Sequence, residues 1–363
     1  MNFSIFTLTN SRSIRGENFI NNSIKKNNLV FDIMSENKHK HLYLNLLIYI
    51  IFFPITIIFF IVKFFIYKQK TIIVLFPGLL ELFLLKILNI KRSKKIGYDF
   101  FTSFYLTLVE DRKKFSSNSI VSRILIFIDR LIFKMSDFQF VESQEMLNYL
   151  KKNLNINTQH TYVLPTPRPI YKQEDYSPDN SYCQLLFWGN FAEMHGIEYI
   201  LDCAKHLSSE KYIFDLIGDG PLMNNIKKRI KNEQIDNIRL LGYLPFYDPK
   251  STNDVVTNIL RADICLGTFS NSIKNNLIIP HKIIEAMSFS KPIITADSIF
   301  IKNNLSEIVR GVPPEDGKKL AVDIEELFND KNLMNELSQK GNKFFHDNFS
   351  EMSFKKKLTG LVI

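Results

Sequence analysis

Short apolar runs alternate with stretches of helical spacing along the N-terminal part of the chain. The apolar runs predict strands, and the amphipathic stretches between them predict helices. The strands are expected at 3–8, 29–34, 71–76, 95–98 and 138–141, and the helices at 12–26, 79–88 and 119–134. A helix between two fully apolar strands is typical of a parallel sheet that is covered on both faces.

The C-terminal part repeats this order with clearer boundaries. Its strands are expected at 185–188, 212–217, 238–241, 264–266 and 292–295, and its helices at 196–207, 222–231, 251–261, 282–289 and 318–329. Residues 162–169 hold three prolines between the two parts and indicate a linker. We therefore predict the α/β class with two doubly wound, Rossmann-like domains, at 1–165 and 170–345. A C-terminal helix over 346–363 is expected to pack back on the first domain.

One apolar segment does not fit this scheme. Residues 42–62 run for 21 positions without a charge, which is long enough to cross a bilayer. Pro54 in the middle would kink or break a helix, and a crossing would separate strands that must share one sheet. Membrane contact of 42–67, as a shallow dip or an interfacial helix, is therefore favoured over a crossing or over burial in a soluble domain. The basic residues on both sides would meet an anionic lipid surface: Lys38, Lys40, Lys63, Lys68 and Lys70.

The charge distribution favours the same partner. The net charge is +9, and residues 1–150 carry all of this excess, with 20 Lys and Arg against 11 Asp and Glu. Basic surfaces bind nucleic acid, anionic membranes or acidic substrates. Here the basic residues adjoin an apolar run and no RNA- or DNA-binding motif, so no nucleic-acid partner is expected. The three cysteines are far apart, which argues against a disulfide framework, and no secretory signal peptide is recognisable.

Two glycine-rich loops follow predicted strands of the C-terminal domain. Gly189-Asn190 opens a loop that ends at His195-Gly196, and Gly218-Asp219-Gly220 opens the next. Glycine lets the backbone approach a phosphate, and the N-terminus of the helix that follows supplies N–H donors. A glycine also ends many strands for steric reasons alone. The two loops together, each followed by a helix, favour phosphate binding at this edge.

A third segment, IIPHKIIEAMSFSKPIITAD from Ile278, carries paired charges. Pro280 stands where a helix begins, and Lys282 and Glu285 share one face of that helix. The carboxylate of Glu285 either stabilises the helix N-terminus or accepts two hydroxyls of a ribose or another sugar. Lys282 would then neutralise a phosphate. The residues alone leave both interpretations open.

This segment resembles the Glu-Ala-Met/Leu-Ala-x-Gly-Lys-Pro-Val-Ile signature of the GT-B glycosyltransferases, family 4 type, also called glycosyl transferases group 1. WGNFAEMHGIEYIL resembles their donor loop, LIGDGP their Gly-x-Gly-Pro turn, and RLLGYLP the strand and glycine that follow. The order and spacing agree over roughly 183–345. The N-terminal half is similar more loosely, at 3–16, 76–78 and 97–112.

The resemblance implies two domains that face each other across a central cleft. The C-terminal domain would hold a nucleotide-diphospho-sugar, with Glu285 on the ribose and with the 189–196 loop and Lys282 near the diphosphate. Tyr243 would border the base. Asp99, at the end of an N-terminal strand, corresponds to a polar residue close to the transferred sugar and is the candidate catalytic residue.

The chain departs from the family pattern at three positions. Asn190 replaces an arginine, His195 replaces a lysine, and Leu277 replaces a second glutamate. Lys274 and Lys282 would restore positive charge at the phosphates, as would a protonated His195; a neutral His195 would donate a hydrogen bond.

We therefore expect transfer without a metal ion, with helix termini and cations stabilising the departing diphosphate, and with no cofactor besides the nucleotide-sugar. Ser11 and Arg15, after the first strand, are expected to meet an acceptor or a phosphate, with capping and surface roles as the alternative.

The resemblance implies a retaining, hexosyltransferase-like enzyme, and we expect it to act in bacterial polysaccharide or lipopolysaccharide biosynthesis. It would act as a peripheral or monotopic protein at the cytoplasmic face of the inner membrane, on a lipid-linked or cell-envelope glycan acceptor. Two alternatives stay open. One is a sugar-nucleotide epimerase of the same architecture, and the other is a non-catalytic nucleotide-sugar-binding partner of another transferase.

Overall fold

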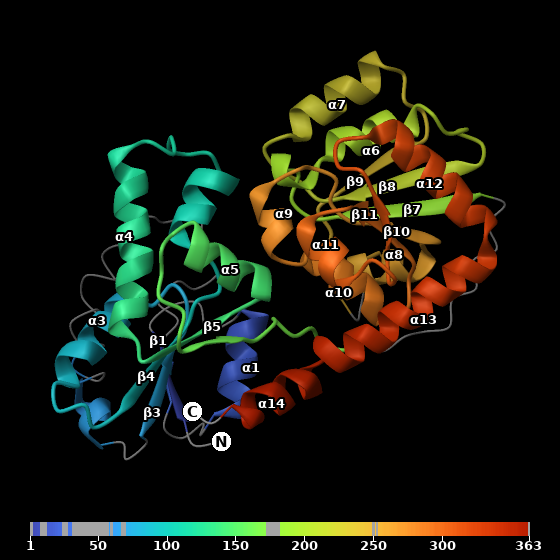
Figure 1. The fold of residues 1–363 in the computed structure, drawn as a ribbon. Coiled ribbons are helices and arrows are strands. Elements are labelled where there is room, and N and C mark those ends of the chain that lie inside the picture. Colours follow the sequence, from blue (N-terminus) through green and yellow to red (C-terminus); the bar gives the residue numbers. More distant parts are fainter. Residues whose placement is uncertain are drawn as a thin grey trace. The chain divides into compact units, whose positions relative to one another are not determined.

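A computed structural model describes residues 3–7, 13–23, 28–30, 58, 61–66, 70–171, 182–248, 251 and 253–361. The chain forms two compact units (Figure 1). Unit 1 consists of residues 1–167 and 351–363, and unit 2 consists of residues 168–350. Most of the predicted membrane segment 42–67 lies outside the described residues. Within the described part of the chain, no helix has both the length and the apolar character that a membrane crossing needs.

Unit 1 contains a parallel sheet of six described strands in the order β2-β1-β3-β4-β5-β6. The strands are β1 Phe3–Thr7, β2 Leu29–Val30, β3 Thr71–Val74, β4 Lys95–Asp99, β5 Phe138–Val141 and β6 Thr161–Val163. The helices are α1 Ile14–Asn22, α3 Leu79–Leu88, η2 Leu106–Asp111, α4 Ile120–Met135, α5 Gln144–Lys152 and α14 Glu351–Gly360.

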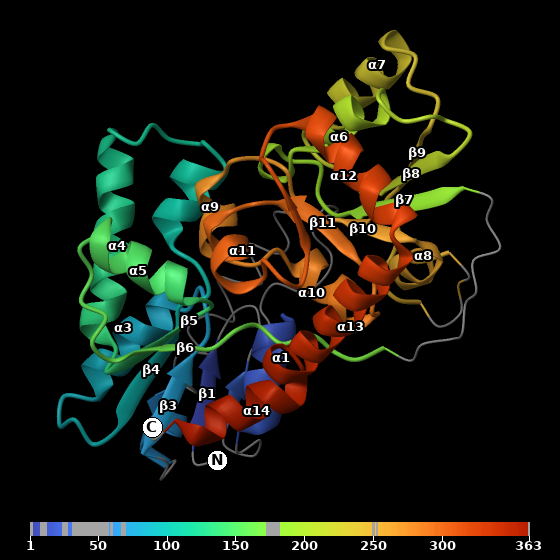
Figure 2. The same cartoon turned by 45° about the vertical axis from the view of Figure 1, so that its right-hand side comes forward.

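The helices of unit 1 cover both faces of this sheet. The connections from β3 to β6 step across the sheet in one direction, and the connection from β1 to β2 steps the other way. Right-handed crossovers therefore place α3, α4 and α5 on one face and α1 on the other, as Figures 1 and 2 show. The α14 helix joins α1, where the ring of Phe354 lies 5.2 Å from the ring of Phe19.

Serine side chains fix where three helices of unit 1 begin. Ser13, Ser119 and Ser143 each accept a hydrogen bond from the backbone N–H three residues later, at the starts of α1, α4 and α5. Such N-caps satisfy donors that the helix itself leaves unpaired. The signal is local, which is why the starts predicted for α1 and α4 lie close to the observed ones.

Unit 2 contains a second parallel sheet, in the order β12-β11-β10-β7-β8-β9. The strands are β7 Cys183–Trp188, β8 Tyr212–Ile217, β9 Ile238–Gly242, β10 Ile264–Leu266, β11 Ile293–Ala296 and β12 Arg310–Val312. The helical elements are η3 Glu193–His195, α6 Ile197–Ala204, α7 Met223–Asn232, α8 Val255–Arg261, α9 Ile273–Leu277, α10 His281–Ser288, α11 Ile299–Asn304, α12 Gly317–Asn329 and α13 Lys331–Asn348.

The central strand β7 faces a core on each side of the sheet. Cys183, Leu185 and Phe187 join the cluster under α6, α7 and α12, whereas Leu186 and Trp188 join the cluster under α8, α10 and α13. Alternate residues of a strand point to opposite faces, so a strand covered on both faces needs the continuous apolar run seen here. The predicted α/β class with two doubly wound, Rossmann-like sheets is confirmed.

The chain differs from expectation around the join between the units. The first residues of the predicted linker 162–169 belong to β6. The helix expected over 346–363 is instead the end of α13 and the separate helix α14, with Phe349 and Ser350 between them. Ser350 bridges to Arg168 there, and the backbone N–H of Arg168 donates to the carbonyl of Phe349 at 2.8 Å.

We predict that the buried ion pair between Arg15 and Asp99 stabilises unit 1. The pair lies at a distance of 2.7 Å with both side chains at most 4% exposed. Asp99→Ala leaves the guanidinium buried without its anion, and the expected loss is about 3–5 kcal/mol in the free energy of unfolding, measured with urea. As a control, Glu336→Ala breaks the solvent-exposed pair with Lys340 and should leave the free energy of unfolding almost unchanged. Equal losses in the two variants would contradict this account.

Candidate functional site

The strand order of unit 2 makes the carboxyl ends of β7 and β10 the expected place for a ligand. These two strands are neighbours, and the connections that follow them run toward opposite edges of the sheet. In open parallel sheets this switch in direction separates the loops and leaves room for a ligand. The loop after β7 starts at Gly189, and the loop after β10 starts at Gly267.

The loop after β7 requires both of its glycines. Gly189 has φ +137° and Gly196 has φ +65°, and both values lie in the region that side chains disfavour. A Cβ on Gly196 would also come within 2.6 Å of the backbone nitrogen of Ser270, in the loop after β10. The chain therefore turns tightly into α6 while touching the neighbouring loop.

The loops after β7 and β8 interlock through backbone contacts. The N–H of Phe191 donates to the carbonyl of Asp219 at 2.9 Å. Gly218 has φ +139°, and a Cβ there would overlap the carbonyl oxygen of Gly189. A Cβ on Gly220 would overlap the side-chain oxygen of Asn190. The structure thus brings together the two glycine loops that the sequence singled out.

Lys282 is a buried lysine at the base of the first loop. It belongs to the first turn of α10, and its Nζ lies 3.4 Å from the centroid of the Phe187 ring and 3.4 Å from Nδ1 of His195. A Cβ on Gly189 would lie 3.5 Å from the same Nζ. Burial sets the pKa of Lys282 well below its ordinary value, because a desolvated ammonium is unfavourable.

His195 is neutral in this environment. Burial first, and then the charges of Lys282 and Lys274, lower its pKa to about 2. A neutral ring can accept a hydrogen bond from Lys282 at Nδ1 and keep its proton on Nε2 as a donor. Of the two roles that the sequence left open for His195, the structure favours neutral donation over positive charge.

Glu285 is held from two sides. The indole N–H of Trp188 donates to its Oε2 at 2.8 Å, and Nε of Arg168 lies 3.1 Å from its Oε1. Its side chain is 13% exposed and that of Arg168 is 6% exposed. A carboxylate offers about four acceptor positions, so two hydroxyls can still bind to it in a fixed orientation.

Sequence reasoning missed Trp188 and Arg168. Trp188 is the single tryptophan of the chain and directly precedes Gly189, which was a usable signal. Arg168 lies among the prolines that indicated a linker, and only the fold brings it to Glu285. Two further residues were missed: Ser270 and Asn275 both donate to the carbonyl of Met194, at 2.5 and 2.9 Å, and so join the loops after β7 and β10.

The other predicted donor-side residues lie around this edge of unit 2. Pro280 is the N-cap of α10, Lys274 lies on the short helix α9, and Tyr243 follows Gly242 with 80% of its surface exposed. Leu277, at the position of the family's second glutamate, is buried. In the described residues, no three His, Cys, Asp or Glu side chains are grouped so that they could hold a metal ion.

Asp99 and Arg15 bind each other within unit 1. The guanidinium contacts both oxygens of Asp99, and its Nη1 donates to the carbonyl of Leu164 at 2.6 Å. Burial raises the pKa of Asp99, and the neighbouring Arg15 lowers it. The roles proposed for these residues toward acceptor and sugar stay predictions. Ser11 lies outside the described residues.

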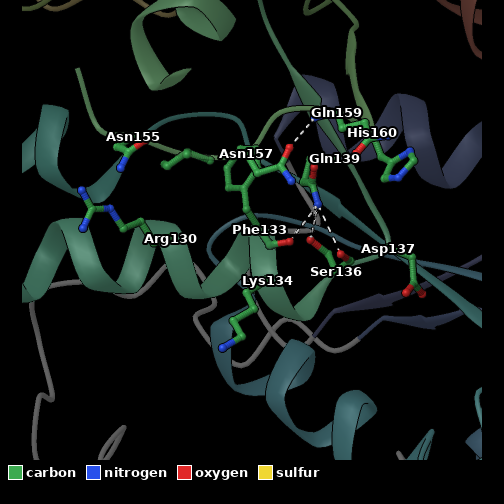
Figure 3. Close-up of a pocket in the computed structure, with 11 residues that line it drawn as sticks. Arg130, Phe133, Lys134, Ser136, Asp137, Gln139, Asn155, Asn157, Gln159 and His160 are labelled. Atoms are coloured by element: carbon green, nitrogen blue, oxygen red, sulfur yellow. Dashed lines mark hydrogen bonds between the residues drawn. The ribbon is translucent and has the colours of Figure 1, made fainter. Parts of the chain in front are cut away.

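A polar pocket of about 300 Å³ lies in unit 1, at the amino-terminal ends of strands β5 and β6 (Figure 3). Its walls come from the segments before β5 and β6, among them Ser136, Asp137 and His160, and from Arg130 and Lys134 of α4. The amide of Gln139 there donates to the hydroxyl of Ser136 at 2.7 Å. Parallel sheets bind ligands at their carboxyl edge, so this pocket is a weaker candidate than the loops of unit 2.

Comparison with known proteins identifies the domain that carries these loops. Residues 171–344 match the family model described as Glycosyl transferases group 1. This stretch is therefore similar to a group 1 glycosyl transferase domain. It includes the 189–196 loop, the 218–220 turn and the α10 helix with Lys282 and Glu285, and it leaves Arg168 just outside.

Two sequence relatives and one solved structure extend the comparison. The chain is 26% identical over 226 residues to a probable glycosyltransferase, WbjE, of Pseudomonas aeruginosa, covering 58% of this chain and 54% of that protein. It is 23% identical over 236 residues to O-antigen chain mannosyltransferase C of Escherichia coli, covering 63% and 58%. The chain thus spans little more than half the length of these relatives.

The solved structure is Anabaena HepE in complex with UDP. It superimposes with a TM-score of 0.69 at 11% identity, covering 99% of this chain and 98% of HepE. The likeness extends over the group 1 glycosyl transferase domain and over unit 1, and it confirms the predicted GT-B fold.

We predict that binding of a nucleotide-sugar to this domain takes up a proton at Lys282. The diphosphate favours the ammonium form and so raises the lowered pKa of Lys282. Affinity should then fall as the pH rises above the pKa of the free protein, by up to about tenfold per unit. Calorimetry between about pH 6 and about pH 9 would measure this slope.

Lys282→Met should bind more weakly and with a flat pH profile. Lys291→Met is the matched control, because burial also lowers the pKa of Lys291, while its Nζ donates to the carbonyls of Leu260 and Ala262 at the end of α8. The control should keep the slope of the unmodified protein. A slope that survives in Lys282→Met would contradict the assignment.

Proposed function

We propose that the protein is a glycosyltransferase that takes a sugar from a nucleotide-diphospho-sugar and passes it to a lipid-linked or cell-envelope glycan. The observation that carries this proposal is the Glu285 carboxylate, fixed by Trp188 and Arg168 at the edge where Lys282 lies buried. Glu285 can accept hydrogen bonds from two hydroxyls, and Lys282, one turn away on the same helix, can bind a diphosphate when it is protonated. That pairing matches the ribose and the diphosphate, which are neighbouring parts of a nucleotide-sugar.

The donor is proposed to lie along the carboxyl edge of unit 2. Its ribose hydroxyls bind Glu285, and its diphosphate lies against the 189–196 loop, Lys282 and the N-terminus of α10, where backbone N–H groups and the helix dipole favour an anion. Tyr243 flanks the base. HepE, the solved structure with the same fold, was crystallised with UDP, which supports a uridine nucleotide as the first donor to test.

The chemistry proposed for this site is departure of the nucleoside diphosphate without a metal ion. Negative charge grows on the diphosphate as the bond to the sugar breaks. A buried ammonium and fixed N–H donors stabilise such charge more strongly than water does, because they are already oriented in a medium of low dielectric constant. We further propose the family 4 type and retention of the anomeric configuration, with Asp99 near the transferred sugar.

The acceptor and its location follow from unit 1 and from the relatives. One relative is an O-antigen chain mannosyltransferase, which supports a glycan of the cell envelope as the product class. The apolar segment 42–67 and the basic N-terminal part support a peripheral or monotopic position at the cytoplasmic face of the inner membrane. Together these features favour an acceptor that is anchored in the membrane.

We predict that a panel of nucleotide-sugars will raise the melting temperature of the purified protein for one class of base. Glu285→Gln should weaken binding of that donor by about 10- to 100-fold, because it removes hydrogen bonds to a charged acceptor. The variant also leaves Arg168 without its anion. The double variant Arg168→Met/Glu285→Met removes both charges and should fold but not bind.

Turnover then separates the three candidate functions. A glycosyltransferase consumes the bound donor only when a membrane-anchored or glycan acceptor is present. Conversion of the donor without an acceptor would instead identify an epimerase. A donor that binds at Glu285 but is never consumed, with any envelope acceptor fraction, would identify a non-catalytic binding partner and contradict the proposal.

A further inference from the structure

Exposed apolar side chains gather in one part of unit 1. Of 20 large hydrophobic residues that are exposed in the described structure, 13 lie between residues 58 and 127. Soluble proteins expose single apolar side chains everywhere, but a cluster of them marks a surface that binds something. The cluster is therefore a functional feature to be explained.

The long helix α4 has two apolar faces. Leu125 and Ile132 point into unit 1 and are buried. Ile120, Ile124 and Phe127 are 75%, 51% and 62% exposed, and their spacing of four and three residues aligns them along one outer stripe. A helix on the surface of a soluble protein normally carries polar residues on this side.

The neighbouring helix α3 shows the same arrangement. Leu82 and Leu85 are fully buried, whereas Leu80, Phe83 and Ile87 are 39%, 51% and 49% exposed. The two helices contact each other and cover the same face of the sheet, as Figures 1 and 2 show. The outer stripes of both helices point away from that sheet. We call these stripes together the α3–α4 surface: Leu80, Phe83, Ile87, Ile120, Ile124 and Phe127.

The charges around the α3–α4 surface are almost all positive. Residues 82–98 contain five Lys and Arg and no acidic residue, and residues 112–136 contain six Lys and Arg and one acidic residue, Asp129. Asp129 is fully buried, where it accepts hydrogen bonds from the hydroxyl of Ser103 and the N–H of Phe104. On α4, Arg123, Arg130 and Lys134 are exposed along one side of the apolar stripe. No carboxylate of α4 therefore opposes these cations at the surface.

We propose that the α3–α4 surface docks on an anionic lipid bilayer. An apolar stripe edged by Lys and Arg, with no exposed acid, is the pattern of a helix that lies in the interface with its apolar side chains among the acyl chains. The basic edge complements anionic headgroups, which attract juxtamembrane Lys and Arg. A protein partner would need acidic groups of its own to match so many cations.

Docking of the α3–α4 surface would bring the protein to the membrane where a lipid-linked acceptor lies. Only this link to the acceptor rests on the proposed function. The surface adds a second contact to that of the segment 42–67, on the folded helices α3 and α4 that follow the segment in the chain. Residues 61–66 are helical, with Phe64 buried and with Val62, Phe65 and Ile66 exposed, so apolar exposure continues from the end of that segment. Unit 1, to which the acceptor side was assigned, is then the membrane-facing unit.

Vesicle co-sedimentation of the full chain tests the proposal. The triple variant Ile120→Ser/Ile124→Ser/Phe127→Ser changes only exposed side chains. Its partition onto vesicles that contain phosphatidylglycerol should fall at least tenfold. A matched control, Ile273→Ser/Ile299→Ser/Val322→Ser, changes three exposed apolar residues of unit 2 and should bind as the unmodified chain does.

A second background isolates the surface from the apolar segment. The same triple change is made in a chain that carries Leu46→Ser, Ile50→Ser, Ile57→Ser and Phe60→Ser. Binding that still depends on Ile120, Ile124 and Phe127 there supports the proposal. Binding that is unchanged by the triple variant in this background would overturn it, as would equal binding to vesicles with and without anionic lipid.

Two further readouts identify other occupants of the surface. A second copy of the chain would appear as an oligomer in light scattering without vesicles, lost in the triple variant, and would overturn the proposal. A lowered melting temperature with unchanged vesicle binding would mean that another part of the chain covers the stripe, and would overturn it too. Nucleotide-sugar binding should stay intact in the triple variant, so a failure of docking is distinguishable from a failure of the donor site.

Discussion

The buried amino group of Lys282 is the constraint on which the donor site depends. Burying a charge is unfavourable unless an opposite charge approaches it. Here the amino group of Lys282 lies over the ring of Phe187, next to a neutral His195, at the end of the central strand. An anionic ligand at the loop of Gly189 would supply the missing charge. The same desolvation that lowers the pKa of Lys282 therefore prepares the site for a diphosphate.

The loops after β7 and β8 have tight backbone turns close to Lys282, and these turns position the rest of the site. The three glycines at 189, 196 and 218 have positive φ, and a Cβ at 196 or 218 would also strike neighbouring backbone. Ser270 and Asn275 bind the first loop to the loop after β10. Glu285 lies three residues beyond Lys282 on α10, and Trp188 and Arg168 set the direction of its carboxylate. The α10 helix, the loops after β7 and β10 and the end of β7 together position the proposed donor-binding residues.

Much of this arrangement could be predicted from local patterns. The continuous apolar runs are typical of strands that are buried on both faces of a parallel sheet, and they predicted the fold class. The candidate ligand-binding residues were found because they stand at the ends of predicted strands or at the start of a predicted helix: Gly189, Gly218, Lys282 and Glu285. The partners of Glu285 could not be predicted in this way, because Arg168 is more than 100 positions away in the sequence and only the tertiary fold brings it near. The pairing of Arg15 with Asp99 is likewise a long-range contact. The outward apolar stripe of α4 was visible as amphipathic spacing, but exposure is known only once the sheet beneath it is placed.

Fluorescence of Trp188 tests the central claim most directly. It is the single tryptophan of the chain, and its indole N–H is bonded to the carboxylate proposed to hold the ribose. Titration with a nucleotide-sugar should change its emission and saturate at the affinity found by calorimetry, and Lys282→Met should shift that curve to higher concentration. Emission that stays constant while equilibrium dialysis shows the nucleotide bound would place the donor elsewhere and contradict the account.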